Sequence, residues 1–396
     1  MKKKLAIIGI KGYPYVYGGY ETFVTELVQR ISDRYEIHVY CHRSLFEERP
    51  KIVNGVHLHY IPAIEGKSFS QLSHSFLSTM HAVFTGYDLC LYVNTANGPF
   101  GYVTRLFNIK SAINVDGLEW LRPKWKGLGA KYFYWASKTA TKAFDVLIAD
   151  SSEMAKIYEN MFNARPEFIA YGANIKEKKT TSNIEQFGIE KGEYYLIVGR
   201  LIPDNNSDLI VKGFLKSGSK KKLVIVGDVP YKDAYAEKIK SYACENVIFT
   251  GYVTSGDLLY DLYANSYCYL HGHEYGGTNP TLLKALAYKC AILALDTVFS
   301  QEVLLGRKHG VYFQKSENSV AAQIRLMDRL PLMTQRLKSI AQNRIRENYT
   351  WEKIADQYDN MFQQMLGGKT VPEVVLYPSK QNNLLPNSGE FISTAK

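Results

Sequence analysis

The stretch from His271 to Leu286, HGHEYGGTNPTLLKAL, decides the fold of the second half of this chain. An apolar run precedes it and a helical periodicity begins at Pro280, which predicts a strand, a glycine turn and a helix. The glycines let the backbone turn sharply and approach a ligand. Thr278 or Asn279 is placed to cap the helix, and Pro280 suits its first position. Because helix N-termini bind phosphate, we interpret this turn as a diphosphate cradle, although an ordinary strand–turn–helix connection has the same pattern.

The composition is that of a globular protein with more than one domain. Of its 396 residues, 46% are hydrophobic and 22% are charged, and domains commonly hold about 100–200 residues. The five cysteines form no CxxC pair, which favours free thiols over disulfides or zinc. No apolar run approaches the length of about 20 residues needed to span a bilayer, and the start MKKKLAIIGIKGYP turns polar too early for a signal peptide. We therefore expect a cytoplasmic protein.

The net charge of +10 favours an anionic partner, which could be a phosphate ligand, an anionic membrane or a nucleic acid. From Arg122 to Lys142 the chain carries six basic residues and no acidic one, and the aromatic run Tyr132–Trp135 lies among them. This pattern suits an anionic lipid surface or a lipid diphosphate. A packed amphipathic helix with solvated lysines explains it equally well.

Short apolar runs alternate with helical periodicity, a pattern typical of parallel sheets flanked by helices. We therefore predict an α/β fold with two Rossmann-like, doubly wound domains. Near Gly172 the pattern gives way to a polar linker, after which a second series of strands begins. The expected parts are an N-terminal domain at 1–172, a C-terminal domain at 173–350, a helix at 351–366 that crosses back to the first domain, and a disordered tail at 367–396.

Doubly wound domains hold ligands at the carboxyl ends of their strands, so we expect the site in a cleft between the two domains. Arg200 follows the predicted strand Tyr194–Val198, where a guanidinium can pair with phosphate oxygens. Asp116 follows a predicted strand of the first domain and is expected to project toward the cleft. The first glycine loop, GIKGYPYVYGGYETF, lacks the GxGxxG spacing, so we discount a nicotinamide cofactor.

At this point the sequence shows a resemblance to a known family. The second half is similar to the retaining glycosyltransferases of the GT-B fold, family 4, in which a strand ending in VGRL, a glycine-rich turn and the following helix hold a sugar nucleotide. The first half is similar to the DUF1972 group, which includes bacterial rhamnosyltransferases of capsule and cell-wall polysaccharide assembly. The resemblance rests on GIKGYPYVYGGYETF, NVDGLEWLRPKWKG, RLIPDNN and HGHEYGGTNP, and it extends to Leu366.

The resemblance implies specific roles for individual residues. Arg200 would contact the donor diphosphate, and Glu274 would lie at the sugar side of the cradle. The donor-binding candidates are Gly18, Gly19, Arg200, Asn205, Gly251, Tyr252, Val253, Gly276, Gly277, Thr278, Asn279 and Lys284. The catalytic candidates are Asp116, Arg200 and Glu274, and the acceptor or membrane candidates are Asp116, Glu119, Trp120, Lys131, Trp135 and Lys138.

Two positions depart from the family 4 pattern. Asn205 stands where a phosphate-binding lysine is common, which matches the DUF1972 group's own pattern. Lys284 stands where a glutamate usually accepts hydrogen bonds from the nucleotide ribose. Because a lysine only donates hydrogen bonds, it could pair with phosphate instead, or the position could be structurally ordinary.

The expected activity is transfer of a sugar, with retention of configuration, from a nucleoside diphosphate to an acceptor hydroxyl. The resemblance makes dTDP-rhamnose the first-choice donor, a dTDP- or UDP-sugar the general class, and a polyprenyl-diphosphate-linked sugar the acceptor. The chain has no DxD pair, so we expect no metal and no cofactor besides the donor. The expected place is the inner face of the plasma membrane, as a peripheral protein without a nucleic-acid partner. The alternatives are a sugar-nucleotide 2-epimerase of similar architecture and a non-catalytic polysaccharide- or membrane-binding scaffold.

Overall fold

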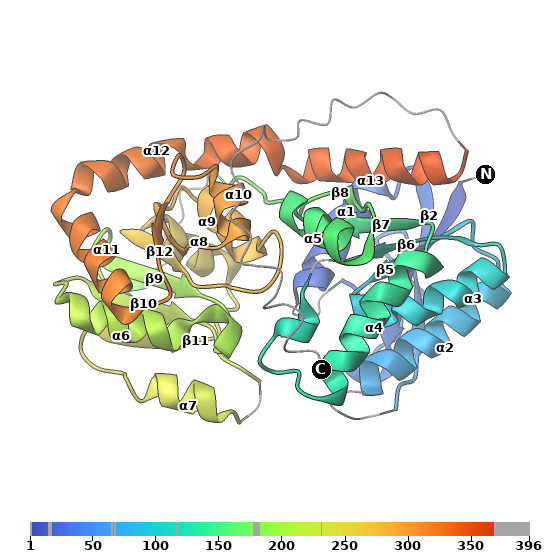
Figure 1. Cartoon of the computed structure of the whole chain (residues 1–396), viewed down its shortest axis with the longest axis horizontal. Helices are drawn as coiled ribbons and strands as arrows, with labels where there is room; N and C mark the ends of the chain where they lie inside the picture. Colours follow the sequence, from blue (N-terminus) through green and yellow to red (C-terminus); the bar gives the residue numbers. More distant parts are fainter. Residues whose placement is uncertain are drawn as a thin grey trace. The chain divides into compact units, whose positions relative to one another are not determined.

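The computed structural model of the chain describes residues 2–14, 18–64, 66, 69–115, 117–176, 183–230 and 232–367. The chain divides into two compact units, which we call unit 1, Met1–Ile169 with Ala355–Lys396, and unit 2, Ala170–Ile354 (Figure 1). These divisions fall at 169 and 354, where the sequence suggested 172 and 350. The expected disordered tail lies, from residue 368 on, outside the described residues.

Unit 1 is built on an eight-stranded sheet in the order β3-β4-β2-β1-β5-β6-β7-β8. The paired strands are parallel except for the antiparallel β3–β4 pair. Their bounds are β1 Lys3–Ile8, β2 Tyr35–His42, β3 Ile52–Val53, β4 Val56–Ile61, β5 Leu89–Val93, β6 Lys110–Asn114, β7 Val146–Ala149 and β8 Glu167–Phe168. The apolar runs that predicted strands in the sequence are the buried interior of this sheet.

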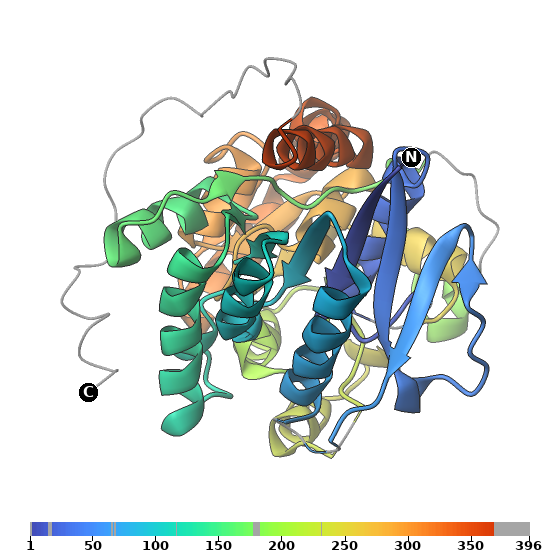
Figure 2. The same cartoon turned by 90° about the vertical axis from the view of Figure 1, so that its right-hand side faces the viewer.

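Helices cover both faces of the unit 1 sheet (Figures 1 and 2). Their bounds are α1 Gly19–Ile31, α2 Phe69–Thr85, α3 Gly101–Leu106, α4 Leu128–Ala143, α5 Ser152–Phe162 and α13 Trp351–Met365. On one face α2 lies against the sheet, where Thr79 and Tyr92 share a hydrogen bond of 2.9 Å. On the other face α1 and α13 pack together, with the rings of Phe23 and Tyr358 5.2 Å apart. The sheet therefore lies between two helical layers.

The C-terminal helix is part of the unit 1 core from Ala355 onward. The Asn114 amide donates to the Tyr358 hydroxyl at 3.0 Å, and Arg34 pairs with Asp359 at 2.7 Å. Tyr358 is almost completely buried. The last helix thus closes one face of the sheet that begins near the N-terminus.

Unit 2 contains a six-stranded sheet in the order β11-β10-β9-β12-β13-β14, and its strand pairs are all parallel. The bounds are β9 Tyr194–Val198, β10 Lys222–Val226, β11 Val247–Gly251, β12 Cys268–His271, β13 Ile292–Leu295 and β14 Val311–Phe313. The strands after β9 are added on one side of it and those from β12 on are added on the other. The carboxyl ends of β9 and β12 therefore form a topological switch point, where α/β sheets bind ligands.

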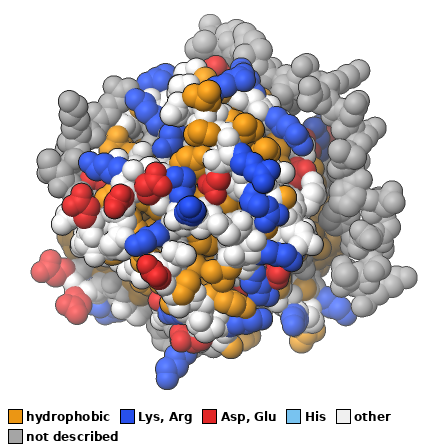
Figure 3. Space-filling model, turned by 90° about the vertical axis from the view of Figure 1, so that its left-hand side faces the viewer, with side chains coloured by type: hydrophobic (Ala, Val, Ile, Leu, Met, Phe, Trp, Pro, Cys, Tyr) orange, Lys and Arg blue, Asp and Glu red, His pale blue; other side chains and the backbone are white. Residues whose placement is uncertain are grey.

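The helices of unit 2 are α6 Ser207–Ser217, α7 Ala234–Lys240, α8 Gly256–Ala264, α9 Pro280–Ala287, α10 Val298–Leu304, α11 Glu317–Arg329 and α12 Pro331–Asn348. Exposed leucines at or beside α6, α11 and α12 include Leu215, Leu326 and Leu332. Figure 3 shows a face of this unit on which hydrophobic side chains are interspersed with lysines and arginines. None of the helices that the structure describes is long and apolar enough to cross a membrane.

Candidate active site

Arg200 lies just after β9, at the switch point of unit 2. The residue is exposed, and among the described residues no carboxylate or other acceptor binds its guanidinium. A guanidinium presents several donors in a planar fork that matches a phosphate group. Arg200 is therefore available to an anionic ligand without first breaking an internal ion pair.

The glycine turn after β12 leads directly into α9, as the sequence predicted. Gly276 has a φ of 132°, in the region that favours glycine. Asn279 caps the helix, because its side-chain oxygen accepts from the Thr281 N–H at 2.9 Å, and Pro280 occupies the first turn. Gly276, Gly277 and Asn279 line a small pocket, together with His271, His273, Leu282, Phe299, Ser300 and Val303. The turn thus places a capped helix N-terminus beside a hollow in unit 2.

The loops after β9 and β12 are tied together by two adjacent asparagines. Asn206 donates to the Gly272 carbonyl at 2.9 Å and to the Glu274 carboxylate at 3.2 Å. Asn205 donates to the Arg200 carbonyl at 2.8 Å, and its Oδ1 lies 2.9 Å from Nδ1 of His273. A Cβ on Gly272 would lie 2.3 Å from the Asn205 carbonyl oxygen, so the two backbones approach as closely as glycine allows. This network holds Arg200 and the glycine turn in one arrangement.

A charged pair lies beside the cradle. The Lys315 ammonium is 2.6 Å from the Glu274 carboxylate, whose side chain is 22% exposed. Lys315 follows β14, a three-residue strand that the sequence analysis did not identify. Its position after the apolar run Val311–Phe313 was the only sequence signal for it. The catalytic candidate Glu274 is therefore a paired carboxylate, and Lys315 is a further cation near the glycine turn.

His271 lines the small pocket, and its imidazole ring is neutral. It is 4% exposed, and burial, with a smaller contribution from the charge of His273, lowers its pKa to about 3. A neutral imidazole can donate one hydrogen bond and accept another. The His271 ring thus adds polarity without positive charge near neutral pH.

The other donor candidates of unit 2 differ in burial and in their position along the sheet. Gly251 has a φ of 67° and ends β11, which is separated from β9 by β10. Tyr252 is exposed and Val253 is half-buried. Thr278 is buried in the glycine turn, whereas Lys284 is half-buried on α9 and is not among the residues that line the small pocket. The structure therefore brings Arg200, Asn205 and the turn together and places Gly251–Val253 further along the same sheet edge.

In unit 1, Gly18 and Gly19 form the start of α1. A Cβ on Gly18 would lie 1.7 Å from a carboxylate oxygen of Glu21, and Glu21 accepts the N–H of Lys11 at 2.9 Å. Burial raises the pKa of Glu21, although the N–H groups of Lys11 and of Glu21 itself act in the opposite direction. The sequence analysis did not identify Glu21, whose carboxylate binds the backbone of the glycine loop. Residues 15–17 of that loop lie outside the described residues.

Five of the six acceptor and membrane candidates divide into three groups. Asp116 lies outside the described residues. Glu119 accepts from the indole N–H of Trp125 at 2.8 Å and also binds Arg122 and, at 3.3 Å, Lys124. Burial opposes its ionisation, but the charges of Arg122 and Lys124 outweigh that effect and hold its pKa below the usual value. The third group, Lys131, Trp135 and Lys138, is exposed on α4.

The predicted position of Trp120 at the protein surface is wrong. The sequence analysis placed it at the acceptor or membrane surface, but its side chain is only 8% exposed. It packs edge-on against Tyr134 and Phe162, with ring centroids 5.9 and 6.1 Å away. Trp120 therefore belongs to a packed aromatic group and not to the surface.

Comparisons with known proteins agree with this architecture. Residues 179–344 match the family model "Glycosyl transferases group 1", and residues 91–174 match the model "Domain of unknown function (DUF1972)". An uncharacterized glycosyltransferase of Methanocaldococcus jannaschii is 24% identical over 399 residues, covering 92% of this chain and 100% of that protein. These matches support a glycosyltransferase of the DUF1972 group.

Solved structures show the same fold at low sequence identity. A sucrose-phosphate synthase from Thermosynechococcus elongatus superposes with a TM-score of 0.77 at 15% identity, covering 92% of this chain and 100% of that chain. HepE of Anabaena, solved in complex with UDP, gives a TM-score of 0.72 at 16% identity with the same coverage. The fold is therefore that of the GT-B glycosyltransferases, as the sequence predicted.

Proposed function

We propose that this chain is a retaining glycosyltransferase that takes a sugar from a nucleoside diphosphate bound at the switch point of unit 2. The observation that carries the proposal is the exposed guanidinium of Arg200, which no acceptor among the described residues binds. Its loop is hydrogen-bonded to the glycine turn before α9. A guanidinium and a helix N-terminus are both suited to a diphosphate. HepE, whose fold is similar, was solved with UDP and with UDP-glucose.

In the proposed reaction the bond between the anomeric carbon and the leaving phosphate oxygen breaks, and a bond to the acceptor oxygen forms on the same face of the sugar. The acceptor proton passes to the leaving phosphate or to Asp116, the candidate for orienting the acceptor. Arg200 and the backbone N–H groups of the turn stabilise the negative charge that develops on the leaving diphosphate. Glu274, held by Lys315, would contact the sugar. The proposed reaction needs no metal and no cofactor besides the donor.

The donor of first choice is dTDP-rhamnose, because the first half of the chain is similar to the DUF1972 group. A screen of dTDP, UDP and their sugars by thermal stabilisation tests this choice. A ligand at a hundred times its dissociation constant stabilises a protein by about 2.7 kcal/mol. We expect the largest shift with dTDP-rhamnose and loss of that shift in Arg200→Ala.

A matched control for the screen is Arg329→Ala, which removes another exposed arginine of unit 2. It should leave the ligand-induced shift unchanged. Equal shifts in both variants, or no shift with any nucleotide sugar, would contradict donor binding at Arg200. Conversion of a nucleotide sugar to its epimer in the absence of an acceptor would instead establish the epimerase alternative.

We also propose that the acceptor is lipid-linked and that unit 1 docks on an anionic membrane through α4. Leu128, Lys131, Trp135, Lys138 and Lys142 recur at intervals of three and four residues and are all exposed. This spacing places them on one side of the helix. Leu128 is 85% exposed and Trp135 is 51% exposed. A stripe that combines exposed apolar side chains with lysines suits the headgroup region of a membrane.

The neighbouring helices extend this docking face. Phe84 on α2 and Phe107 at the end of α3 are exposed and lie 5.7 Å apart between ring centroids, and Leu106 of α3 is 79% exposed. Figures 1 and 2 show α2, α3 and α4 grouped over the same face of the sheet. Each lysine near an anionic surface contributes roughly 1 kcal/mol, and the aromatic side chains add an apolar contribution that salt does not remove.

Co-sedimentation with neutral and anionic vesicles tests the docking face. The variant Lys131→Glu, Lys138→Glu, Lys142→Glu should lose binding to anionic vesicles. The control Arg325→Glu, Arg329→Glu, Arg336→Glu makes the same change of charge on α11 and α12, where the side chains are also exposed, and should keep it. Equal loss in both variants would attribute binding to net charge alone, and no binding by the unmodified protein would contradict membrane docking.

A further inference from the structure

Six of the nine histidines in the chain lie in a single layer of unit 1: His38, His42, His57, His59, His74 and His81. They belong to β2, β4 and α2. The parallel register pairs His38 with His57 and Tyr40 with His59. Because side chains alternate along a strand, this register places the histidines of the two strands on the face of the sheet that α2 covers, where Tyr40 bonds to His81 at 2.8 Å.

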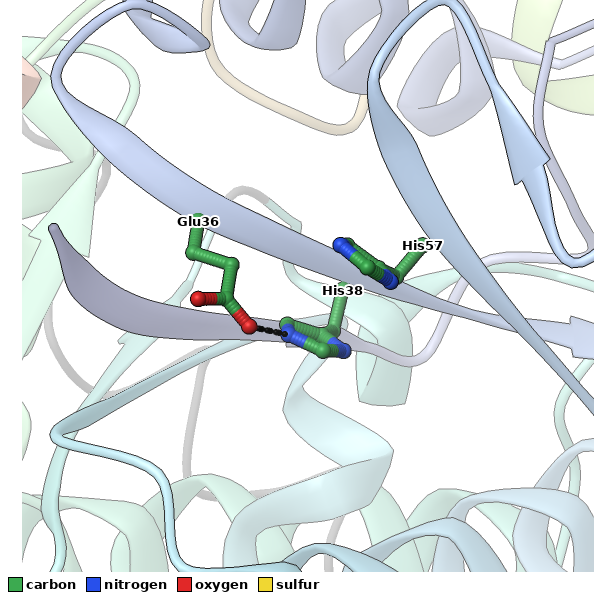
Figure 4. Close-up of side chains that lie close together, drawn as sticks. All are labelled: Glu36, His38 and His57. Atoms are coloured by element: carbon green, nitrogen blue, oxygen red, sulfur yellow. Dashed lines mark hydrogen bonds and ion pairs between the residues drawn. The ribbon is translucent and has the colours of Figure 1, made fainter.

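Three of these side chains and a neighbouring carboxylate form a compact group near the amino-terminal ends of β2 and β4. Glu36 Oε1 lies 3.0 Å from Nε2 of His38. The rings of His38 and His57 stack with centroids 4.5 Å apart and an interplanar angle of 16°, as Figure 4 shows. One ligand atom from each of Glu36, His38 and His57 falls within 4.8 Å of the others. His59 lies on the other side of His38 and contacts its Nδ1.

The bond to His59 organises His38 as a ligand. Nδ1 of His38 lies 3.0 Å from Nε2 of His59, which in turn lies 3.2 Å from the Tyr87 hydroxyl. When an ion is bound at Nε2 of His38, the N–H at Nδ1 can donate to His59. A metal-bound histidine commonly donates its other N–H to such a partner.

We propose that Glu36, His38 and His57 form a binding site for a divalent transition-metal ion, with zinc as the ion that two imidazoles and a carboxylate suit. Zinc takes such ligands at about 2.0–2.2 Å in a tetrahedron, which leaves one position for water. The Glu36–His38 separation already approximates the edge of that tetrahedron. The His57 ring is only partly buried, and a shift of roughly 1.5 Å brings its nitrogen to the same spacing.

One positive charge competes with the proposed ion for Glu36. The Lys4 ammonium is 3.9 Å from the Glu36 carboxylate. Its side chain is 43% exposed and can turn into solvent when a metal ion binds. The proposed ion would join β2 to β4, independently of the sugar-transfer site.

The test uses the full chain without a histidine tag, freed of metal by a chelator, and titrated with zinc by calorimetry. We expect one zinc ion per chain and a higher melting temperature with zinc than without. Magnesium, which prefers oxygen ligands in an octahedron, should not compete. His57→Ala and the nearly isosteric Glu36→Gln should each weaken zinc binding roughly tenfold or more.

The matched control is His81→Ala, which removes an exposed histidine of the same layer that is not a proposed ligand. It should bind zinc as the unmodified protein does. Zinc binding that survives both ligand substitutions, or that is lost equally in the control, would overturn the assignment, as would the absence of saturable binding by the unmodified chain. Because no nucleotide sugar is present, neither result depends on the proposed transferase function.

Discussion

Replacing Arg200 by alanine should separate catalysis from stability. The side chain is exposed, and among the described residues no partner binds its guanidinium, so truncation breaks no hydrogen bond or ion pair that the structure describes. The free energy of unfolding should therefore change by less than about 0.5 kcal/mol, as for other surface substitutions. In the transition state, by contrast, the leaving diphosphate gains charge beside the guanidinium. Loss of one such electrostatic donor typically costs about 3 kcal/mol, or about 100- to 1,000-fold in kcat.

The assay combines steady-state kinetics with thermal melting on the same preparations. Arg200→Ala should melt with the unmodified protein and lose most of its turnover with dTDP-rhamnose. Arg200→Lys should recover part of the turnover, because lysine keeps the charge but not the planar fork. Arg329→Ala, which truncates another exposed arginine of unit 2, should retain full activity.

Two results would refute this reasoning. Unchanged turnover in Arg200→Ala would remove the residue from the donor site. A large fall in melting temperature would show that the guanidinium supports the loop after β9, and the loss of activity would then report on folding. Asn205 binds the Arg200 carbonyl and not its side chain. We therefore expect the loop after β9 to keep its stability in Arg200→Ala.

Three further predictions address the metal, the nucleotide and the acid response. Sugar transfer should survive EDTA at a temperature well below the melting point, and restoration of a lost activity by magnesium or manganese would contradict the proposed role of Arg200 and the turn. Lys284→Glu should lower the affinity for dTDP in calorimetric titration; a higher affinity would show that a glutamate at this position accepts bonds from the ribose instead. Because burial lowers the pKa of His271 to about 3, the unfolded chain, in which histidine titrates near 6.5, takes up a proton that the folded chain refuses as the pH falls below about 6.5. His271 alone should therefore lower the free energy of unfolding by about 2 kcal/mol between pH 6.5 and 5. Denaturant melts of His271→Asn should show a flatter dependence on pH, and equal slopes would contradict the buried neutral ring.

The sequence predicted the sheets well where a strand is a sustained apolar run. The predicted strand Tyr194–Val198 is β9 with the same bounds. The two strands it missed, β3 at Ile52–Val53 and β14 at Val311–Phe313, are too short to show a period. Both missed strands lie at an edge of their sheet.

The contacts within the candidate site depend on partners that are distant in sequence. Asn206 and Gly272 are 66 residues apart, and the Glu274–Lys315 pair spans 41 residues, so no local pattern could reveal either contact. Local signals did identify Arg200, the glycine turn and the Asn279 cap. The histidine group arises from the register of β2 against β4, and this register is a property of the folded sheet.

The most direct test of the central claim is the product of the reaction. The full chain is incubated with dTDP-rhamnose and a polyprenyl-diphosphate-linked sugar, and the product is analysed by mass spectrometry and by NMR of its new anomeric centre. We expect one sugar to be added to the acceptor with the anomeric configuration of the donor. A product with inverted configuration, or no acceptor-dependent product with any dTDP- or UDP-sugar, would contradict a retaining glycosyltransferase.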